Sequence, residues 1–370
     1  MEYSYWELKE WFTNIDFTIV GSGIVGLSCA LALQKEHPKA KILVLEKGML
    51  PQGASTKNAG FACFGSLSEL IDDLNSHSKE EVFNLVYKRW EGLQLLRSNL
   101  GDKNIDFQKN KGFELCDSED FFEACISKKQ EINTLLKPIF KDDVFSISEN
   151  TFNFQKVYQK YIVNNFEGQI DTGKMAFKLL QTAQQLGIKI LNNISVESFA
   201  ETGSKINIKT NRLDFYTKKL FIATNGFTNT LLNEKVQPAR AQVLITKPIK
   251  NLDIKGTFHL DKGYYYFRNI DNRILFGGGR NLDFKTEETS DFGQTALIQN
   301  ELESILKTTI LPNTPFEIDH RWSGIMGVGN QKKAIVKQLS EHVFCGVRLG
   351  GMGVAIGSLV GKELAELIHE

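Results

Sequence analysis

The sequence has no excess of either charge. Its 370 residues carry 44 lysines and arginines against 44 aspartates and glutamates, so the formal net charge is zero. A protein that holds nucleic acid through its phosphates usually presents a basic surface, and we therefore expect no nucleic-acid partner. At roughly 150 residues per domain, the length predicts about two domains.

Proline and long apolar stretches are scarce. Seven prolines are too few for a Pro-rich linker, and 42% apolar residues is typical of a folded protein. No segment reaches the ~18 uncharged apolar residues of a membrane span. Residues 1–16 carry charged side chains between aromatic ones, whereas a secretory signal has an apolar centre. These features predict a soluble cytoplasmic protein that spans no membrane.

Cysteine and histidine show no pattern of disulfides or metal ligands. The cysteines are odd in number, widely spaced and free of any C-x-x-C motif, and the six histidines are scattered. We therefore expect a reducing compartment, no disulfide framework and no metal site. The cysteines are Cys29, Cys63, Cys116, Cys125 and Cys345.

The N-terminal region has the pattern of a nucleotide-binding βαβ unit. An apolar strand at 17–20 runs into GSGIVG, an apolar helix follows, and a second strand covers 41–48. Gly21 permits the tight turn, Gly23 lets the backbone approach a pyrophosphate, and Gly26 allows the helix to pack closely on the strand. The N-terminus of the helix would supply N–H groups for phosphate.

Glu46 lies at the end of the second strand, 25 positions after Gly21. A carboxylate at this position accepts hydrogen bonds from ribose hydroxyls and would repel a 2′-phosphate, which argues against NADP. A surface residue at a strand end is the alternative interpretation.

Further along the chain, helical spacing predicts helices over about 78–100 and 119–136, and a third that begins at Asp171 or Thr172. Between about 240 and 279, short strand patterns replace the helical ones. The βα pattern therefore pauses, resumes near residue 170, and gives way to a second, mostly antiparallel unit.

Several segments together carry a family resemblance. From about Phe17 onward the chain resembles FAD-dependent oxidoreductases of the D-amino-acid oxidase, glycine oxidase and sarcosine oxidase superfamily. The segments that carry it are VGSGIVGLSCALAL, VLEKG, GASTKNAG, QIDTGKMAFKLLQTAQQLGIKIL, IATNGFT, PARAQVL, YYYFR, ILFGGGR and FCGVRLGGMGVAIGSLVGKELAEL.

The resemblance implies an α/β fold, with a doubly wound, Rossmann-like FAD-binding domain and a second β-rich α+β substrate domain. We expect both domains to be discontinuous in sequence. The FAD-binding domain would comprise residues 1–80, 150–235 and 320–370, and the substrate domain residues 81–149 and 236–319.

The resemblance also implies which residues contact FAD. Glu46 would hold the adenosine ribose, the segment 54–56 would run past the pyrophosphate and ribityl chain, and the backbone of Val196 would contact adenine. The segment 350–354 would present the N-terminus of the last helix to the flavin pyrimidine edge, where reduced flavin carries negative charge. The expected cofactor residues are Gly21, Gly23, Ile24, Val25, Gly26, Glu46, Lys47, Ala54, Ser55, Thr56, Asn58, Ala59, Gly60, Val196, Ala223, Thr224, Gly226, Gly350, Gly351, Met352, Gly353 and Val354.

The implied reaction is hydride transfer from the carbon of a small amine or amino acid to flavin N5, followed by hydrolysis of the imine, with oxygen as a candidate acceptor. In relatives an arginine that binds the substrate carboxylate lies in the stretch that reads HRWSGIMGVG here, and Met326 takes its place. Arg348, Tyr266 and Arg268 are therefore the expected substrate-binding residues.

Relatives with covalently bound flavin have a cysteine in this same stretch, and this chain has none there. We therefore expect non-covalent FAD. His320 is the residue in this stretch that could overturn that expectation.

Two other functions stay open at this point. The chain could be a non-catalytic flavin-binding subunit or sensor, or it could be an NAD-dependent dehydrogenase. Nothing after Gly48 resembles a nicotinamide-side motif.

Overall fold

The computed structural model describes residues 2–369, which form two eight-stranded sheets and a two-stranded one. In the first sheet β17, β18, β11, β1, β2 and β8 are neighbours in that order, and β10 and β9 extend it from β11. The pairs within β18–β11–β1–β2–β8 are parallel. The strands are β1 (Ile15–Val20), β2 (Ile42–Leu45), β8 (Lys189–Leu191), β9 (Val196–Thr202), β10 (Lys205–Thr210), β11 (Asp214–Ile222), β17 (Ile335–Gln338) and β18 (Val343–Val347).

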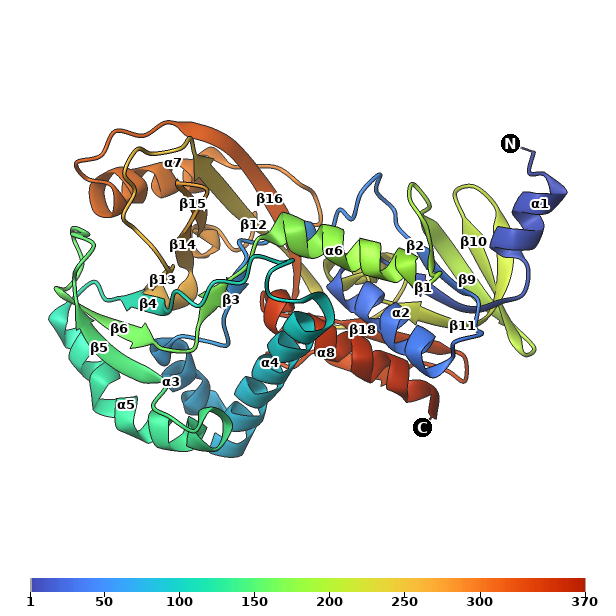
Figure 1. Cartoon of the computed structure of the whole chain (residues 1–370), viewed down its shortest axis with the longest axis horizontal. Coiled ribbons are helices and arrows are strands. Elements are labelled where there is room, and N and C mark those ends of the chain that lie inside the picture. Colours follow the sequence, from blue (N-terminus) through green and yellow to red (C-terminus); the bar gives the residue numbers. More distant parts are fainter. Residues whose placement is uncertain (1, 370) are drawn as a thin grey trace.

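Helices cover one face of this sheet (Figure 1). They are α2 (Ile24–Glu36), α6 (Thr172–Gln185) and α8 (Gly353–Glu366), and they share one core with the strand residues beneath them. The helices α2 and α8 approach closely because small residues face each other: a Cβ on Gly361 would lie 2.5 Å from the carbonyl oxygen of Val25. The opposite face packs against β9 and β10. Buried on both faces, β2 consists entirely of apolar residues, as parallel strands do.

The second sheet is mostly antiparallel, in the order β16, β12, β15, β14, β13, β4, β6 and β5, with one parallel pair, β13–β4. Its aromatic residues alternate, and Phe258, Phe267 and Phe276 point into a core that α7 (Ala296–Ile305) helps to cover. The strands are β4 (Gly112–Leu115), β5 (Phe145–Glu149), β6 (Lys160–Asn164), β12 (Gln237–Thr246), β13 (Thr257–Leu260), β14 (Tyr265–Ile270), β15 (Arg273–Gly278) and β16 (Ile318–Val328).

Three further helices pack against one another. They are α3 (Leu67–Ser76), α4 (Lys79–Leu100) and α5 (Glu119–Phe140). Ser66 and Ser78 begin α3 and α4 with capping boxes, in which each serine and the glutamate three residues later satisfy each other's backbone N–H. Figure 1 shows α4 running from the α3–α5 region to α8. None of the helices among residues 2–369 is long and apolar enough to cross a membrane.

Short elements complete the chain. A π-helical segment, η1 (Leu8–Phe12), follows α1 (Tyr5–Glu7), and both lie at the far end of the first sheet (Figure 1). The two-stranded sheet pairs β3 (Phe61–Ala62) with β7 (Gly168–Gln169). The remaining short helical segments are η2 (Ala54–Thr56), η3 (Asn225–Thr230), η4 (Asp261–Gly263), η5 (Arg280–Leu282), η6 (Leu306–Ile310) and η7 (Leu367–His369).

The expected fold class, a parallel nucleotide-binding sheet with a second β-rich sheet, is confirmed. Two strands differ from the expected division of the chain. By sheet membership, β6 and β16 belong to the second sheet, whereas we had expected residues 150–235 and 320–370 to be in the FAD-binding domain. Their pairing partners, β4 and β12, are distant in sequence, which a strand pattern alone does not reveal. The domain boundaries themselves stay a prediction.

Candidate functional site

A cavity of about 790 Å³ lies between the two sheets. The carboxyl ends of β1, β2 and β11 open into it, and residues of β12, β13, β14 and β16 line its opposite wall. Ligands of open parallel sheets bind in this position, outside the carboxyl ends of the strands. The geometry therefore places the nucleotide motif and the second sheet around one space.

The turn after β1 has the close contacts that the glycine motif predicts. Gly21 has a φ of +104°, and a Cβ on it would lie 2.7 Å from the carbonyl oxygen of Ala223. A Cβ on Gly26 would collide with the carbonyl oxygen of Gly21, so this glycine serves the packing of α2 and does not line the cavity. The N–H of Ile24, in the first turn of α2, donates to Ser55 Oγ at 2.9 Å. Gly21 and Gly23 line the cavity, and without side chains they would let a phosphate group approach the backbone.

Glu46 is buried at the cavity wall, with 6% of its surface exposed. One carboxylate oxygen accepts hydrogen bonds from the backbone N–H and hydroxyl of Ser22, and the other accepts from the N–H of Gly48 at 3.0 Å. These bonds orient the carboxylate toward the nucleotide turn. The structure thus fits the ribose-binding role expected for Glu46 and argues against the surface-residue alternative.

The loop after η2 is anchored from beneath by Arg268. Its guanidinium donates to the carbonyl oxygens of Ala59 and Ile170, and the buried side chain pairs with no carboxylate of residues 2–369. Burial lowers the pKa of Arg268 to about 10. Because Arg268 does not line the cavity, the geometry assigns it to the loop and not to substrate.

The N-terminus of α8 forms a second glycine-rich wall. Asn225 Oδ1 accepts hydrogen bonds from the backbone N–H groups of Arg348 and Leu349, and the segment 350–354 lines the cavity immediately after them. Gly226 does not line the cavity, because it packs against β16, where a Cβ would lie 2.6 Å from the carbonyl oxygen of Met326.

Most of the expected cofactor residues line this one cavity. Exceptions are Gly26, Gly226 and Thr56, whose hydroxyl donates to the carbonyl oxygen of Pro51. The residues that do line it are Gly21, Gly23, Ile24, Val25, Glu46, Lys47, Ala54, Ser55, Asn58, Ala59, Gly60, Val196, Ala223, Thr224, Gly350, Gly351, Met352, Gly353 and Val354. Their contacts with FAD stay a prediction.

On the side of the second sheet, a row of cross-strand neighbours faces the cavity. Tyr266 of β14 pairs with His259 of β13 and with Gly277 of β15, where a Cβ would lie 2.8 Å from the Tyr266 ring. Phe61 lies edge-on to both rings, at 5.3 Å from His259 and 5.6 Å from Tyr266. Strand alternation turns Tyr265 into the core and Tyr266 toward the cavity, as expected for an aromatic strand with one buried face.

His259 and Glu167 form a buried pair at this wall. His259 Nε2 lies 2.6 Å from Glu167 Oε1, and the two side chains are 8% and 1% exposed. Burial lowers the pKa of His259, but the charge and hydrogen bond of Glu167, with Glu69 and Glu114 further away, outweigh it and raise the pKa to about 9. Glu167 therefore favours the protonated imidazolium form of His259 at the cavity wall.

Arg348 is not where we expected it. Its φ of +64° turns the side chain away from the cavity, and the guanidinium donates to the carbonyl oxygens of Lys333 and Lys235. Met326 does line the cavity, beside Gly351. The geometry therefore gives no support to Arg348 as the substrate anchor, and we do not propose it.

Several cavity residues were missed at the sequence level. His259 shares a sheet face with Tyr266, so the strand alternation in TFHL could have indicated it once the pairing was known. Glu69 and Lys332 come from a helix and a loop with no motif to mark them. Further residues that line the cavity are Lys57, Phe61, Cys63, Glu69, Asp72, His259, Lys262, Tyr264, Arg280, Met326 and Lys332.

Comparison with known proteins agrees with this geometry. The family model described as "DAO: FAD dependent oxidoreductase" matches residues 16–367. The chain is 22% identical over 378 residues to gamma-glutamylputrescine oxidoreductase of Escherichia coli, covering 96% of this chain and 83% of that protein. One similar solved structure is L-proline dehydrogenase from P. horikoshii, with a TM-score of 0.76 and 18% identity; the match covers 96% of this chain and 93% of that one. Another is glycine oxidase from Bacillus cereus, with a TM-score of 0.73 and 16% identity; the match covers 96% of this chain and 95% of that one. With its family match, its two sheets and the nucleotide turn at their shared cavity, the chain belongs to the DAO family of FAD-dependent oxidoreductases.

Proposed function

We propose that this protein oxidises the C–N bond of a small amine or amino acid, using non-covalently bound FAD. The observation that carries the proposal is the continuity of the cavity, in which the nucleotide turn at Gly21 and the sheet face at Tyr266 line the same space. A substrate bound against Tyr266 would therefore share its chamber with the cofactor. The relatives named above act, by their names, on a gamma-glutamyl amine, proline and glycine.

The residues present fit FAD. The Glu46 carboxylate would accept hydrogen bonds from ribose hydroxyls, and the first turn of α2 would face the pyrophosphate. When bound, FAD supplies the hydride acceptor. The N-terminus of α8 brings backbone N–H groups and the positive end of a helix dipole to the cavity, which favours negative charge there.

On the substrate side, the walls would orient the reacting carbon. Tyr266 is half-buried, and desolvation raises the pKa of its phenol to about 12, so it stays a neutral hydrogen-bond donor. An amine that binds in its neutral form needs no dedicated base for loss of hydride, and water completes the hydrolysis of the imine. Positioning and exclusion of water are therefore the tasks of this wall.

The test is anaerobic reduction of the purified yellow protein by a panel of amines, amino acids and 2-hydroxy acids. We expect amines or amino acids to bleach the flavin absorbance and oxygen to restore it. Bleaching by 2-hydroxy acids alone would reject C–N oxidation.

Two outcomes correspond to the other functions. A yellow protein that no member of the panel reduces would indicate a flavin-binding subunit or sensor. A colourless protein that binds NAD instead would indicate a dehydrogenase.

A further inference from the structure

Arg280 is the one arginine among residues 2–369 that lines the cavity. It follows β15 directly, and the N–H of its neighbour Gly279 donates to the carbonyl oxygen of Tyr264 at 3.0 Å. This places Arg280 beside the aromatic strand at the substrate end. A guanidinium there could reach a bound molecule, whereas Met326 offers no charge.

Four other arginines in or beside the two sheets are already engaged. Arg240 forms a two-point ion pair with Glu287, and Arg321 donates to Gln299 and Glu303. Arg268 and Arg348 donate to backbone carbonyl oxygens, as described above. To bind any one of these arginines, the carboxylate of a ligand would have to displace the group that the guanidinium already contacts.

Arg280 has no such partner. Within residues 2–369 its guanidinium makes no hydrogen bond and no ion pair, and its neighbour is the ring of Phe284, whose centre lies 4.8 Å from the guanidinium carbon. Burial lowers the pKa of Arg280. The charges of Tyr264, Glu287 and Glu288 act in the opposite direction but offset this lowering only in part. A half-buried cation on an aromatic face gains most from a carboxylate that approaches its open edge.

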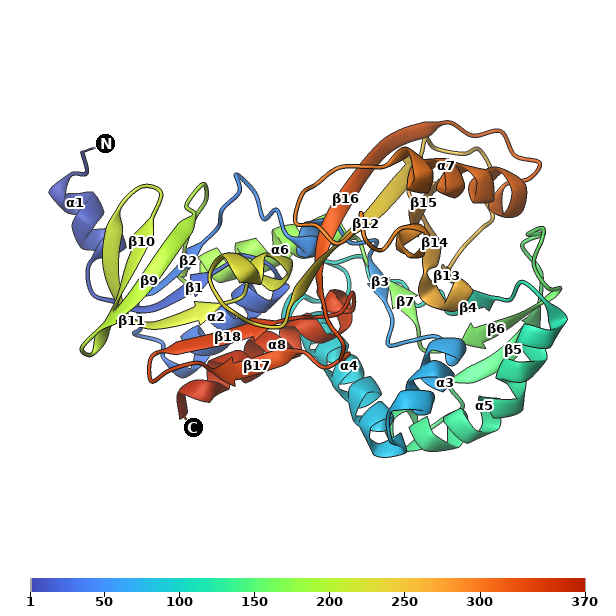
Figure 2. The ribbon, with the colours of Figure 1, turned by 180° about the vertical axis from the view of Figure 1, so that it is seen from behind.

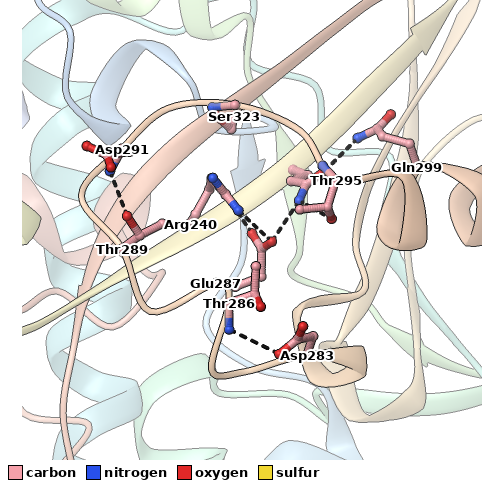
Figure 3. Close-up of polar contacts among 11 residues, drawn as sticks. Arg240, Asp283, Thr286, Glu287, Thr289, Asp291, Thr295, Gln299 and Ser323 are labelled. Atoms are coloured by element: carbon pink, nitrogen blue, oxygen red, sulfur yellow. Dashed lines mark hydrogen bonds and ion pairs between the residues drawn. The ribbon is translucent and has the colours of Figure 1, made fainter.

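A network of polar contacts around Glu287 holds the loop that carries Arg280 (Figure 3). The Glu287 carboxylate is fully buried, and both its oxygens accept hydrogen bonds from Arg240 at 2.8 Å. Gln242 adds a third bond to Glu287 and also donates to Thr295, at the far end of the loop. This network commits the buried Glu287 to Arg240, so its carboxylate is not available as a hydrogen-bond partner of Arg280.

The remaining charges around the cavity do not cancel this cation. Asp72 lies 3.9 Å from Lys262, and Glu69 accepts a hydrogen bond from the N–H of Ser66 within its capping box. These acids belong to α3, and their contacts are with Lys262 and Ser66, not with Arg280. Lys57 and Lys262 add positive charge to the same space.

We propose that Arg280 binds the carboxylate of the substrate, so that the substrate class is amino acids or other carboxylated amines. This inference rests on the proposed function, because it names the residue that would bind the carboxylate of an amine or amino-acid substrate. A guanidinium binds a carboxylate at two points, which would also fix the orientation of the carbon that loses hydride.

The first test measures binding without turnover. Simple carboxylates such as acetate, propionate and benzoate are titrated into the FAD-loaded protein, and flavin absorbance changes report their dissociation constants. We expect Arg280→Met to weaken this binding about 30-fold, the loss typical of a charge-assisted hydrogen bond, and Arg280→Lys to recover part of it. The matched control is Arg212→Met, which removes an exposed arginine in the β10–β11 turn.

The second test compares an amino acid that reduces the flavin with the amine that lacks its carboxylate. In Arg280→Met the half-saturating concentration should rise about 30-fold for the amino acid and stay unchanged for the amine. Equal losses for both, or no loss for either, would overturn the inference. So would an absence of any carboxylate binding in the wild-type protein.

The two proposals can fail separately. If carboxylates bind through Arg280 but no amine or amino acid reduces the flavin, C–N oxidation is rejected and the anion site stands. Retained flavin and an unchanged absorbance spectrum in Arg280→Met would show that the variant is folded.

Discussion

The Oδ1 atom of Asn225 accepts a hydrogen bond from the backbone N–H of Arg348 at 3.1 Å, and a second one from Leu349 at 3.2 Å. Arg348 has a φ of +64°, a conformation that non-glycine residues seldom adopt. Asn225 therefore holds in place the turn that leads into the N-terminus of α8.

Asn225→Ala should release this turn. Loss of hydrogen bonds to two backbone N–H groups costs about 1–3 kcal/mol of unfolding free energy, and we expect weaker retention of FAD on dilution. Flavin content after gel filtration measures the second effect. Asn313→Ala, at an exposed position, is the control, and equal flavin content in both variants would contradict the prediction.

Glu46→Ala should purify partly or wholly without FAD. The carboxylate would accept from two ribose hydroxyls, and each charge-assisted hydrogen bond typically contributes about 1.5–3 kcal/mol. Flavin absorbance relative to protein absorbance is the measurement, with the exposed Glu197→Ala on β9 as control. If Glu46→Ala binds FAD as tightly as wild type, the carboxylate is not the ribose anchor.

Glu287→Gln should loosen the loop that carries Arg280. It leaves the Arg240 guanidinium buried without a carboxylate, which costs roughly 3–5 kcal/mol of unfolding free energy. Protease cleavage between Arg280 and Thr295 should accelerate. In the double variant Arg240→Met, Glu287→Leu, with neither charge present, much of the lost stability should return; if it does not, the ion pair is not the cause.

The His259–Glu167 pair predicts a pH-dependent stability. The folded-state pKa of His259 is about 9 against an ordinary value of 6.5, so its contribution is complete below pH 6.5 and is lost as pH rises through 9. Wild-type unfolding free energy should fall across this range by on the order of 1–3 kcal/mol relative to the double variant His259→Gln, Glu167→Gln. Parallel pH profiles of the two proteins would contradict the charged pair.

The FAD should be released by acid or heat. Cys63 is the cysteine that lines the cavity, and burial raises the pKa of its thiol, which disfavours the nucleophilic thiolate. His320 does not line the cavity. After denaturation and ultrafiltration the yellow colour should pass the filter. Colour retained with wild-type protein but not with Cys63→Ser would show a covalent bond to that residue.

The nucleotide half of the site could be predicted from sequence because its geometry is local. In GSGIVG the glycines, the strand before them and the helix after them determine one turn, and Glu46 ends the next parallel strand. Gly21 and Glu46 reach one cavity because the parallel strands β1 and β2 of the βαβ unit end at the same edge of the sheet.

The substrate half could not be predicted, because it depends on where side chains far apart in sequence point. The sequence predicts that Arg348 reaches the flavin from the end of β18, but its left-handed backbone and the carbonyl oxygens of Lys235 and Lys333 direct it elsewhere. Arg280 became distinctive only once Glu287 was seen to be paired with Arg240. A strand pattern shows alternation but not the partner of each strand.

The order of strands in the first sheet also determines at which stage of synthesis the sheet and its cavity can form. The central strand β1 is synthesised before β11, with which it pairs at Ile15 and Thr217, and β11 in turn pairs with the later strand β18 at Leu220 and Val343. Figure 2 shows β18 and α8 lying together along one edge of this sheet. Until β11 has been synthesised, β1 can pair only with β2, so one edge of this apolar strand stays without its partner, and the wall that α8 adds to the cavity forms later still.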